Sequence, residues 1–213
     1  GRALAVALAK EGVHVVLTDV DVAGLEATRQ LLPSPAAATV CRLDVTSRAQ
    51  WAEVRDVVTK EHGRVDGLVN NAGILLSPQL FVDTPVDAFD KVVATNLQAV
   101  ADGTRTFLPL LMQQPSSRLV NVASAAGLVG LMGYSAYSMA KFGVRGLSEA
   151  LQMELRGTGV CVTVVFPGGV KTNIMKNAPD LTTDDARQAA HDGFSMGALT
   201  TPETVAHRVL RAM

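Results

Sequence analysis

Short apolar segments rich in β-branched residues alternate with longer helical segments along the chain, and this alternation constrains the fold more than any other feature. Strand and helix units joined by short loops form a parallel sheet with right-handed crossovers. We expect strands at residues 13–19, 38–44, 65–70, 118–124 and 160–166. We expect helices at residues 2–11, 21–32, from a cap at Thr46 or Ser47 to about 62, 86–112, 135–156 and from about 202 onward.

The pattern predicts an α/β protein with a doubly wound parallel sheet between two layers of helices. Apolar runs at the strand centres indicate that both faces of the sheet are covered. No linker separates the units, so we expect one domain over residues 1–213. A core of this size needs no disulfide or metal for stability.

Composition excludes several function classes. A net charge of −1, with Lys and Arg spread along the chain, argues against nucleic acid and anionic membranes as partners. No uninterrupted apolar stretch reaches about 18 residues, so no membrane span is expected. The four histidines lack metal-binding spacing. Cys41 and Cys161 fall in strand-like runs without a CxxC partner, and we expect buried, reduced thiols of a cytoplasmic protein.

The strongest chemical signal is Tyr137-Ser138-Met139-Ala140-Lys141 near the start of a helix. Residues four apart share one helix face, so the phenol and the ammonium can meet at one site. A tyrosine with its ordinary pKa near 10 is a poor acid or base at neutral pH, and a neighbouring cation lowers that pKa. The pair therefore indicates a proton-transfer site, although an ordinary surface Lys beside a half-buried Tyr gives the same pattern.

Two further polar residues extend this candidate catalytic set. Ser124 ends a strand thirteen residues before Tyr137, where open α/β sheets bind ligands, and its hydroxyl either donates to a substrate carbonyl or caps a turn. Asn96 lies inside a long apolar helix, although Asn is a mediocre helix former. It indicates a purposeful hydrogen bond or a kink, unless it lies on the surface.

Three segments at strand ends are candidate cofactor contacts. Asn70-Asn71-Ala72-Gly73 offers small residues beside which a flat ligand can approach the backbone closely. Residues 167–172, with Pro167 and Gly168, form a sharp exit from the last strand, and Thr172 can contact a ligand. Asp19 ends the strand at 13–19, where a carboxylate accepts hydrogen bonds from ribose hydroxyls or caps a helix. Asp21 competes for either role.

Taken together, these motifs in this order resemble the short-chain dehydrogenase/reductase family in its single-domain form, over the whole chain. The resemblance implies a Rossmann-like sheet, a nicotinamide cofactor and hydride transfer between a secondary alcohol and a ketone. It implies that Tyr137 exchanges the proton at the substrate oxygen, that Ser124 polarises the carbonyl, and that Lys141 lowers the tyrosine pKa and holds the nicotinamide ribose. Asn96 would fix a water that links Lys141 to a proton relay.

The resemblance also implies a set of cofactor contacts. They comprise Gly1, Asp19, Asp44, Val45, Asn70, Ala72, Gly73, Tyr137, Lys141, Pro167, Gly168, Val170 and Thr172. Asp19, with no Arg at positions 18 and 20, favours NAD over NADP. Residues 173–201 resemble the substrate lid of the family, and the helices at 86–112 and 135–156 resemble its dimer interface, so a homodimer or homotetramer is expected.

The sequence departs from the family at both ends. Of the phosphate-binding TGxxxGxG motif only the last glycine is present, as Gly1, and the first and last strands are lacking. We therefore expect a fragment of a longer gene product that binds dinucleotide poorly or not at all, because its pyrophosphate-binding loop is incomplete. The strands at 13–19 and 65–70 would then lie about 10 Å apart with unpaired edges facing each other.

Three alternatives stay open at this point. Tyr134, seven residues before Lys141, has the spacing of the divergent enoyl reductases in the family, but the Ser124 spacing favours Tyr137. The same catalytic residues serve a 3-oxoacyl thioester reductase equally well. A non-catalytic dinucleotide-binding fragment is the alternative from another class. The small-molecule substrate itself cannot be named.

Overall fold

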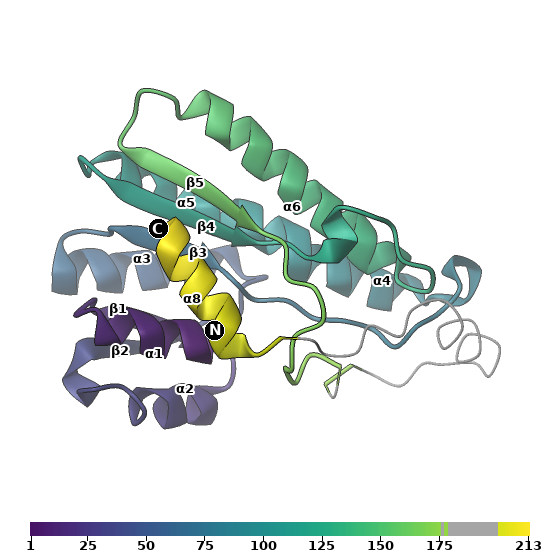
Figure 1. The fold of residues 1–213 in the computed structure, drawn as a ribbon, viewed down its shortest axis with the longest axis horizontal. Coiled ribbons are helices and arrows are strands. Elements are labelled where there is room, and N and C mark those ends of the chain that lie inside the picture. Colours follow the sequence, from purple (N-terminus) through teal and green to yellow (C-terminus); the bar gives the residue numbers. More distant parts are fainter. Residues whose placement is uncertain (176, 179–199) are drawn as a thin grey trace.

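Two parallel sheets form the middle layer of the molecule (Figure 1). The computed structural model describes residues 1–175, 177–178 and 200–213. In one sheet β1 (Val15–Asp19) pairs with β2 (Ala38–Arg42), and in the other the order is β3 (Gly67–Asn70), β4 (Ser117–Val122), β5 (Val160–Val165). Every pairing is parallel, so within each sheet the strands end at the same edge.

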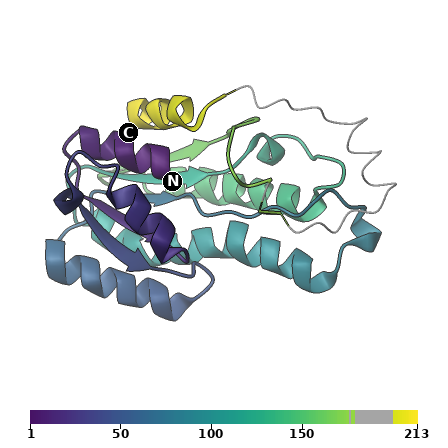
Figure 2. The ribbon, with the colours of Figure 1, turned by 90° about the horizontal axis from the view of Figure 1, so that it is seen from below.

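Helices cover both faces of this layer, as Figure 2 shows from below. One face carries α1 (Arg2–Lys10), α2 (Val22–Arg29) and α8 (Pro202–Ala212). The other carries α3 (Arg48–His62), α4 (Val86–Val93), α5 (Ala99–Met112) and α6 (Ser135–Glu154). Short 3-10 turns lie at Pro35–Ala37, Phe81–Asp83 and Ala125–Gly127. The predicted three-layer α/β/α fold is confirmed.

The helices hold the two sheets together, because β1 and β3 are not paired in the described residues. On one face α1 packs both on the β1–β2 sheet and, beside α8, on Val69 and Val120 of the other. On the opposite face α3 and α5 enclose a cluster that Val16 of β1 and Leu68 of β3 both join. The predicted lack of pairing between these two strands is thus confirmed for the described residues, and their separation of about 10 Å stays a prediction.

Local capping residues set the helix ends much as the sequence predicts. Ser47, rather than Thr46, caps α3 by accepting a hydrogen bond from the Gln50 amide. Gly63 ends that helix with φ of 68°, a left-handed conformation that favours glycine. Asp21 caps α2 through the Gly24 amide. The two roles left open for Asp19 and Asp21 therefore separate, and Asp21 takes the cap.

The long helix predicted at residues 86–112 is interrupted. A π-helical turn, Ala94–Gln98, separates α4 from α5 and contains the fully buried Asn96. π-Bulges insert one residue into a helix and are frequent at functional sites. The prediction of a purposeful hydrogen bond at Asn96 is confirmed by its contact with Ile74.

The expectation that both cysteines are buried is wrong for Cys161, which is exposed, while Cys41 is half-buried. Cys161 lies on β5, whose neighbours Val160 and Val162 face the core beneath α6. Successive strand side chains point to opposite faces, so Cys161 points away from that core. A strand-like sequence pattern does not reveal whether the second face is covered.

Most of the predicted substrate lid at residues 173–201 lies outside the described residues. No helix in the described ranges has the length and hydropathy needed to cross a bilayer.

Candidate functional site

The carboxyl edge of the sheets gathers most of the residues that the sequence singled out. β4 leads into Ser124, which caps the Ala125–Gly127 turn by accepting a hydrogen bond from the Ala126 amide. Tyr137 and Lys141 lie in the first two turns of α6. Of the two roles left open for Ser124, the structure shows the cap, and donation to a substrate carbonyl stays a prediction.

Tyr137, Ser124 and Lys141 converge on one point. The Tyr137 phenol shares a side-chain hydrogen bond with Ser124, and the Lys141 Nζ lies 5.6 Å from the centroid of the Tyr137 ring. Lys141 is 3% exposed, and its ammonium donates to the Val122 carbonyl at 2.9 Å. The backbone of β4 thus fixes the Lys141 head group, a partner for which the sequence offers no signal.

Burial dominates the protonation behaviour of this pair. It raises the pKa of the Tyr137 phenol above its ordinary value, and the hydrogen bond with Ser124 acts in the opposite direction. It lowers the pKa of the Lys141 ammonium from 10.5 to about 8. Desolvation of the phenolate is thus the largest effect on the pKa of Tyr137 in the chain alone, and the expected lowering of that pKa by Lys141 stays a prediction.

Asn96 supports the floor of this site. Its Oδ1 accepts from the Ile74 amide and its Nδ2 donates to the Ile74 carbonyl, both at 2.8 Å. The clamp holds the chain directly after Gly73. A Cβ at Gly73 would stand 3.2 Å from the Asn96 Oδ1 and 3.6 Å from the Lys141 Nζ. Glycine therefore keeps open the space beside the ammonium.

The predicted cofactor segments lie next to one another. Gly1 caps α1, and a Cβ built on it would lie 3.4 Å from the Asn71 Nδ2, so the start of α1 adjoins the exposed Asn71 and Ala72. The Pro167 carbonyl accepts from the Ala125 amide at 2.9 Å, which ties residues 167–172 to the Ser124 turn.

The segment after Pro167 continues along the same edge. Gly168 is exposed, and Val170 forms an isolated parallel bridge with Thr200. The exposed Thr172 hydroxyl accepts from the Ile174 amide at 3.4 Å. These positions are open to a ligand, and their predicted role in cofactor binding stays a prediction.

Two carboxylates mark the ends of β1 and β2. Asp19 is exposed, and its Oδ1 accepts from the Asp21 amide at 3.1 Å. Asp44 accepts from both the backbone and the hydroxyl of Thr46, and these hydrogen bonds lower the pKa of the Asp44 carboxyl. The Val45 carbonyl accepts from the Trp51 indole, so the Asp44–Val45 turn is held by α3.

The Asn70 side chain points away from this site, and the predicted cofactor contact of its segment through the backbone stays a prediction. It is 6% exposed and donates to Thr104 of α5 at 3.0 Å and to Asn121 of β4 at 2.8 Å. Asn121 in turn donates to Ser148 of α6. The last residue of a strand points to one face of the sheet, and here that face is the one covered by α5 and α6. The Asn70 side chain instead joins the sheet to two helices.

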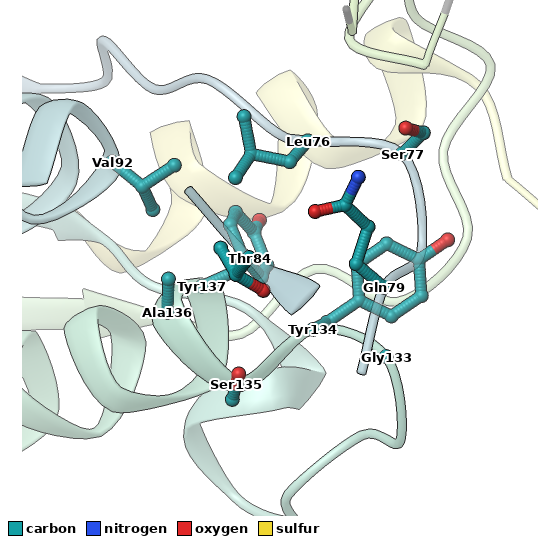
Figure 3. Close-up of a pocket in the computed structure, with 10 residues that line it drawn as sticks. All are labelled: Leu76, Ser77, Gln79, Thr84, Val92, Gly133, Tyr134, Ser135, Ala136 and Tyr137. Atoms are coloured by element: carbon teal, nitrogen blue, oxygen red, sulfur yellow. The ribbon is translucent and has the colours of Figure 1, made fainter. Parts of the chain in front are cut away.

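A pocket adjoins the Tyr137 ring (Figure 3). Leu76, Ser77, Gln79, Thr84, Val92, Gly133, Tyr134, Ser135, Ala136 and Tyr137 line it. Tyr134 and Tyr137, the two candidate tyrosines, thus line the same pocket. Of the two, Tyr137 is the one that shares a hydrogen bond with Ser124. The lining residues at 76–84 were missed, because a loop carries no periodicity that indicates which side chains turn inward.

Comparison with known proteins agrees with this geometry. A family model described as short chain dehydrogenase matches residues 1–182. The 3-oxoacyl-[acyl-carrier-protein] reductase of Thermotoga maritima is 32% identical over 99% of this chain and 84% of its own.

Solved structures match as well. A short chain dehydrogenase/reductase from Burkholderia phymatum, crystallised in complex with NAD, is 28% identical with a TM-score of 0.87 over 100% of this chain and 80% of that chain. A levodione reductase is 32% identical with a TM-score of 0.88 over 99% of this chain and 84% of that chain.

Proposed function

This chain belongs to the short-chain dehydrogenase family, and on that premise we propose that Tyr137, Ser124 and Lys141 carry out its oxidoreductase chemistry on a secondary alcohol or ketone. The single observation that carries the proposal is the convergence of the phenol, the hydroxyl and the ammonium at the carboxyl edge of the sheet. Ligands bind at this edge in open α/β sheets. Such a convergence also argues against a non-catalytic scaffold.

In the proposed mechanism Tyr137 exchanges a proton with the substrate oxygen. In the oxidative direction the phenolate accepts the hydroxyl proton, and in the reductive direction the phenol returns it. The Ser124 hydroxyl hydrogen-bonds the same oxygen and orients the carbonyl. Lys141, anchored on the Val122 carbonyl, presents positive charge 5.6 Å from the Tyr137 ring and so favours the phenolate when protonated.

A nicotinamide dinucleotide fits the residues of this edge, and when bound it supplies the hydride acceptor or donor. The space that Gly73 leaves beside Lys141 would be closed by any larger side chain. Exposed Asn71 and Ala72 adjoin the start of α1, whose first amides are suited to an anion. Asp44, Val45, Gly168, Val170 and Thr172 would contribute further contacts along the same edge.

We propose NAD rather than NADP. Asp19 places an exposed carboxylate at the end of β1, where it would accept from ribose hydroxyls and repel a 2′-phosphate. The relative from Burkholderia phymatum was crystallised with NAD. A lower KM for NADPH than for NADH would contradict this assignment.

The test of the proposed function is Tyr137→Phe. We expect turnover to fall at least about 100-fold, because general acid–base catalysis contributes roughly 10² to 10⁴. The matched variant Tyr134→Phe removes the other phenol that lines the pocket, and its loss should be far smaller. A loss below about ten-fold in Tyr137→Phe, or a larger loss in Tyr134→Phe, would contradict the assignment.

The second candidate is reduction of a 3-oxoacyl thioester, which the similarity to the Thermotoga maritima reductase favours. The same three residues would serve it. Turnover of an acyl carrier protein substrate far above that of small ketones would select this candidate.

We further propose a homodimer or homotetramer. Met139, Phe142 and Met153 of α6 are 46%, 41% and 57% exposed and offer an apolar stripe to a second copy. Light scattering in solution measures the assembly. The cytoplasmic location expected from the sequence stays a prediction.

A further inference from the structure

The pocket beside Tyr137 holds more hydrogen-bonding side chains than one reacting carbonyl can use. Apart from Tyr137, its polar lining comprises Ser77, Gln79, Thr84, Tyr134 and Ser135. In the proposed mechanism Ser124 and Tyr137 already take the reacting oxygen. The remaining polar groups would lie beside a part of the substrate at which no bond is made or broken, and any of them with hydrogen-bonding capacity to spare could distinguish substrates by what that part carries.

Gln79 is the most deeply placed of these groups. It is 4% exposed although it lies in the loop between β3 and α4. Figure 3 shows its carboxamide pointing into the pocket. Gln79 thus brings a hydrogen-bonding carboxamide to the buried side of the pocket.

The backbone fixes Gln79 relative to the catalytic helix. Its amide donates to the Gly133 carbonyl at 2.9 Å, directly before the start of α6. Gly133 has φ of 80°, and a Cβ there would stand 3.1 Å from the Pro78 Cβ. The Gln79 loop and the Tyr137 helix are therefore joined at a position that requires glycine.

Thr84 in the same pocket serves as a comparison. Its hydroxyl donates its single hydrogen to the Leu80 carbonyl at 3.0 Å, so it has none left for a ligand. A carboxamide has two hydrogens to donate and an oxygen with two lone pairs, so Gln79 can bind a substrate oxygen while keeping another contact. Gln79 thus has the capacity to recognise a second oxygen.

We propose that Gln79 is a specificity residue that selects substrates with a second oxygen, namely hydroxyketones, diketones or the corresponding diols. The inference rests on the proposed function, because it takes Tyr137 and Ser124 as the groups that bind the reacting carbonyl. Gln79 binds the other oxygen and takes no part in hydride or proton transfer.

The experiment compares cyclohexanone with cyclohexane-1,2-dione and cyclohexane-1,4-dione as matched probes, with NADH as reductant. In Gln79→Leu we expect kcat/KM for the preferred dione to fall about ten-fold or more, while the value for cyclohexanone stays within about three-fold. A site built to hydrogen-bond an oxygen discriminates strongly against analogues that lack it. Thr84→Val is the control in the same pocket, and its dione-to-ketone ratio should stay that of the unmodified chain.

Each outcome decides one of the two claims. An equal fall for ketone and diones, or an unchanged ratio, overturns the role of Gln79 while the proposed function stands. No turnover of any probe contradicts the proposed function on small ketones, and the inference falls with it. If thermal unfolding shows that Gln79→Leu is not folded, Gln79→Met keeps the length of the side chain and removes both donor hydrogens. The proposal then requires the same selective loss for the dione in Gln79→Met.

Discussion

At the scale of single residues, the Lys141 ammonium is buried, and burial disfavours its charged form. It is 3% exposed, and burial lowers its pKa from 10.5 to about 8. Lowering the pKa by this amount means that the charged form costs roughly 3 kcal/mol more in the folded chain than in the unfolded chain. No described acidic side chain forms an ion pair with it, and the Val122 carbonyl compensates only in part. The charged Lys141 thus lowers the free energy of unfolding, at a site whose proposed chemistry needs that charge.

Replacement of Lys141 by Met should therefore stabilise the fold at pH 7, by about 1–3 kcal/mol, since the lost hydrogen bond to Val122 offsets part of the gain. The folded pKa lies below the unfolded one, so the unfolded chain binds more protons between about pH 8 and 10.5. The stability of the unmodified chain should rise with pH across that window relative to Lys141→Met. Urea unfolding at pH 7 and pH 10 measures both, and an equal gap at the two pH values would contradict the prediction.

The sequence predicted that Ser124, Tyr137 and Lys141 lie together, and the structure brings them together, but their pKa values could not be predicted. The spacing of four residues places Tyr137 and Lys141 on one helix face whatever surrounds them. Their pKa values depend on burial, which is set by packing from distant segments. The same reason explains Asn70, whose position at a strand end was correct and whose side chain nonetheless turned inward. Position along an element is local information, whereas the choice of face is not.

At the scale of elements, the π-helical turn between α4 and α5 depends on one side chain. Asn96 supplies both the acceptor for the Ile74 amide and the donor for the Ile74 carbonyl. Helix capping was readable from the sequence, as at Ser47 and Gly63, because cap residues act on their own helix. The π-turn was not readable, because it depends on a contact with a loop 22 residues away.

Asn96→Ala should therefore destabilise the chain by about 2–4 kcal/mol. The change leaves two backbone groups of Ile74 without their partners, and each buried unsatisfied group costs roughly 1–3 kcal/mol. Urea unfolding measures the loss. Asn173→Ala, in an exposed turn, is the matched control and should change stability by no more than about 0.5 kcal/mol. Equal stability of Asn96→Ala and the unmodified chain would show that the clamp contributes nothing.

At the scale of the whole molecule, two sheets share one pair of helical layers without sharing a hydrogen bond. β1 pairs with β2, β3 pairs with β4, and the described strands form no ladder between β1 and β3. The first sheet has its own core with α1 and α2, which includes Leu25. The second has its own core with α5 and α6, which includes Leu151. In place of a strand ladder, side-chain packing joins them, through α1 on one face and α3 with α5 on the other, where Arg48 and Asp102 also form an ion pair.

The sequence predicted the facing edges because the order of strands follows from the alternation and the family resemblance. It did not predict how the halves stay together. That depends on α1 lying across both sheets, with Leu4 packed near Val120 and Ala5 in the other core. Contacts of one helix with two sheets depend on packing between distant segments, and no periodicity of the sequence indicates them.

Such an arrangement should unfold in two steps. Backbone hydrogen bonds transmit cooperativity between neighbouring strands, and packing contacts across a layer transmit less, so the β1–β2 unit should open at a lower free energy than β4, which is paired on both sides. Hydrogen exchange in low urea measures both openings. Leu25→Ala and Leu151→Ala form a matched pair, since both leucines are buried, at 6% and 7% exposure. Each truncation should lower the free energy of unfolding by about 2–5 kcal/mol.

Leu25→Ala should accelerate hydrogen exchange in β1 and β2 and leave β4 unchanged, whereas Leu151→Ala should accelerate exchange in β3, β4 and β5. If both variants accelerate exchange equally in all five strands, the two sheets unfold as one unit, and the helical layers couple them as tightly as a continuous ladder would.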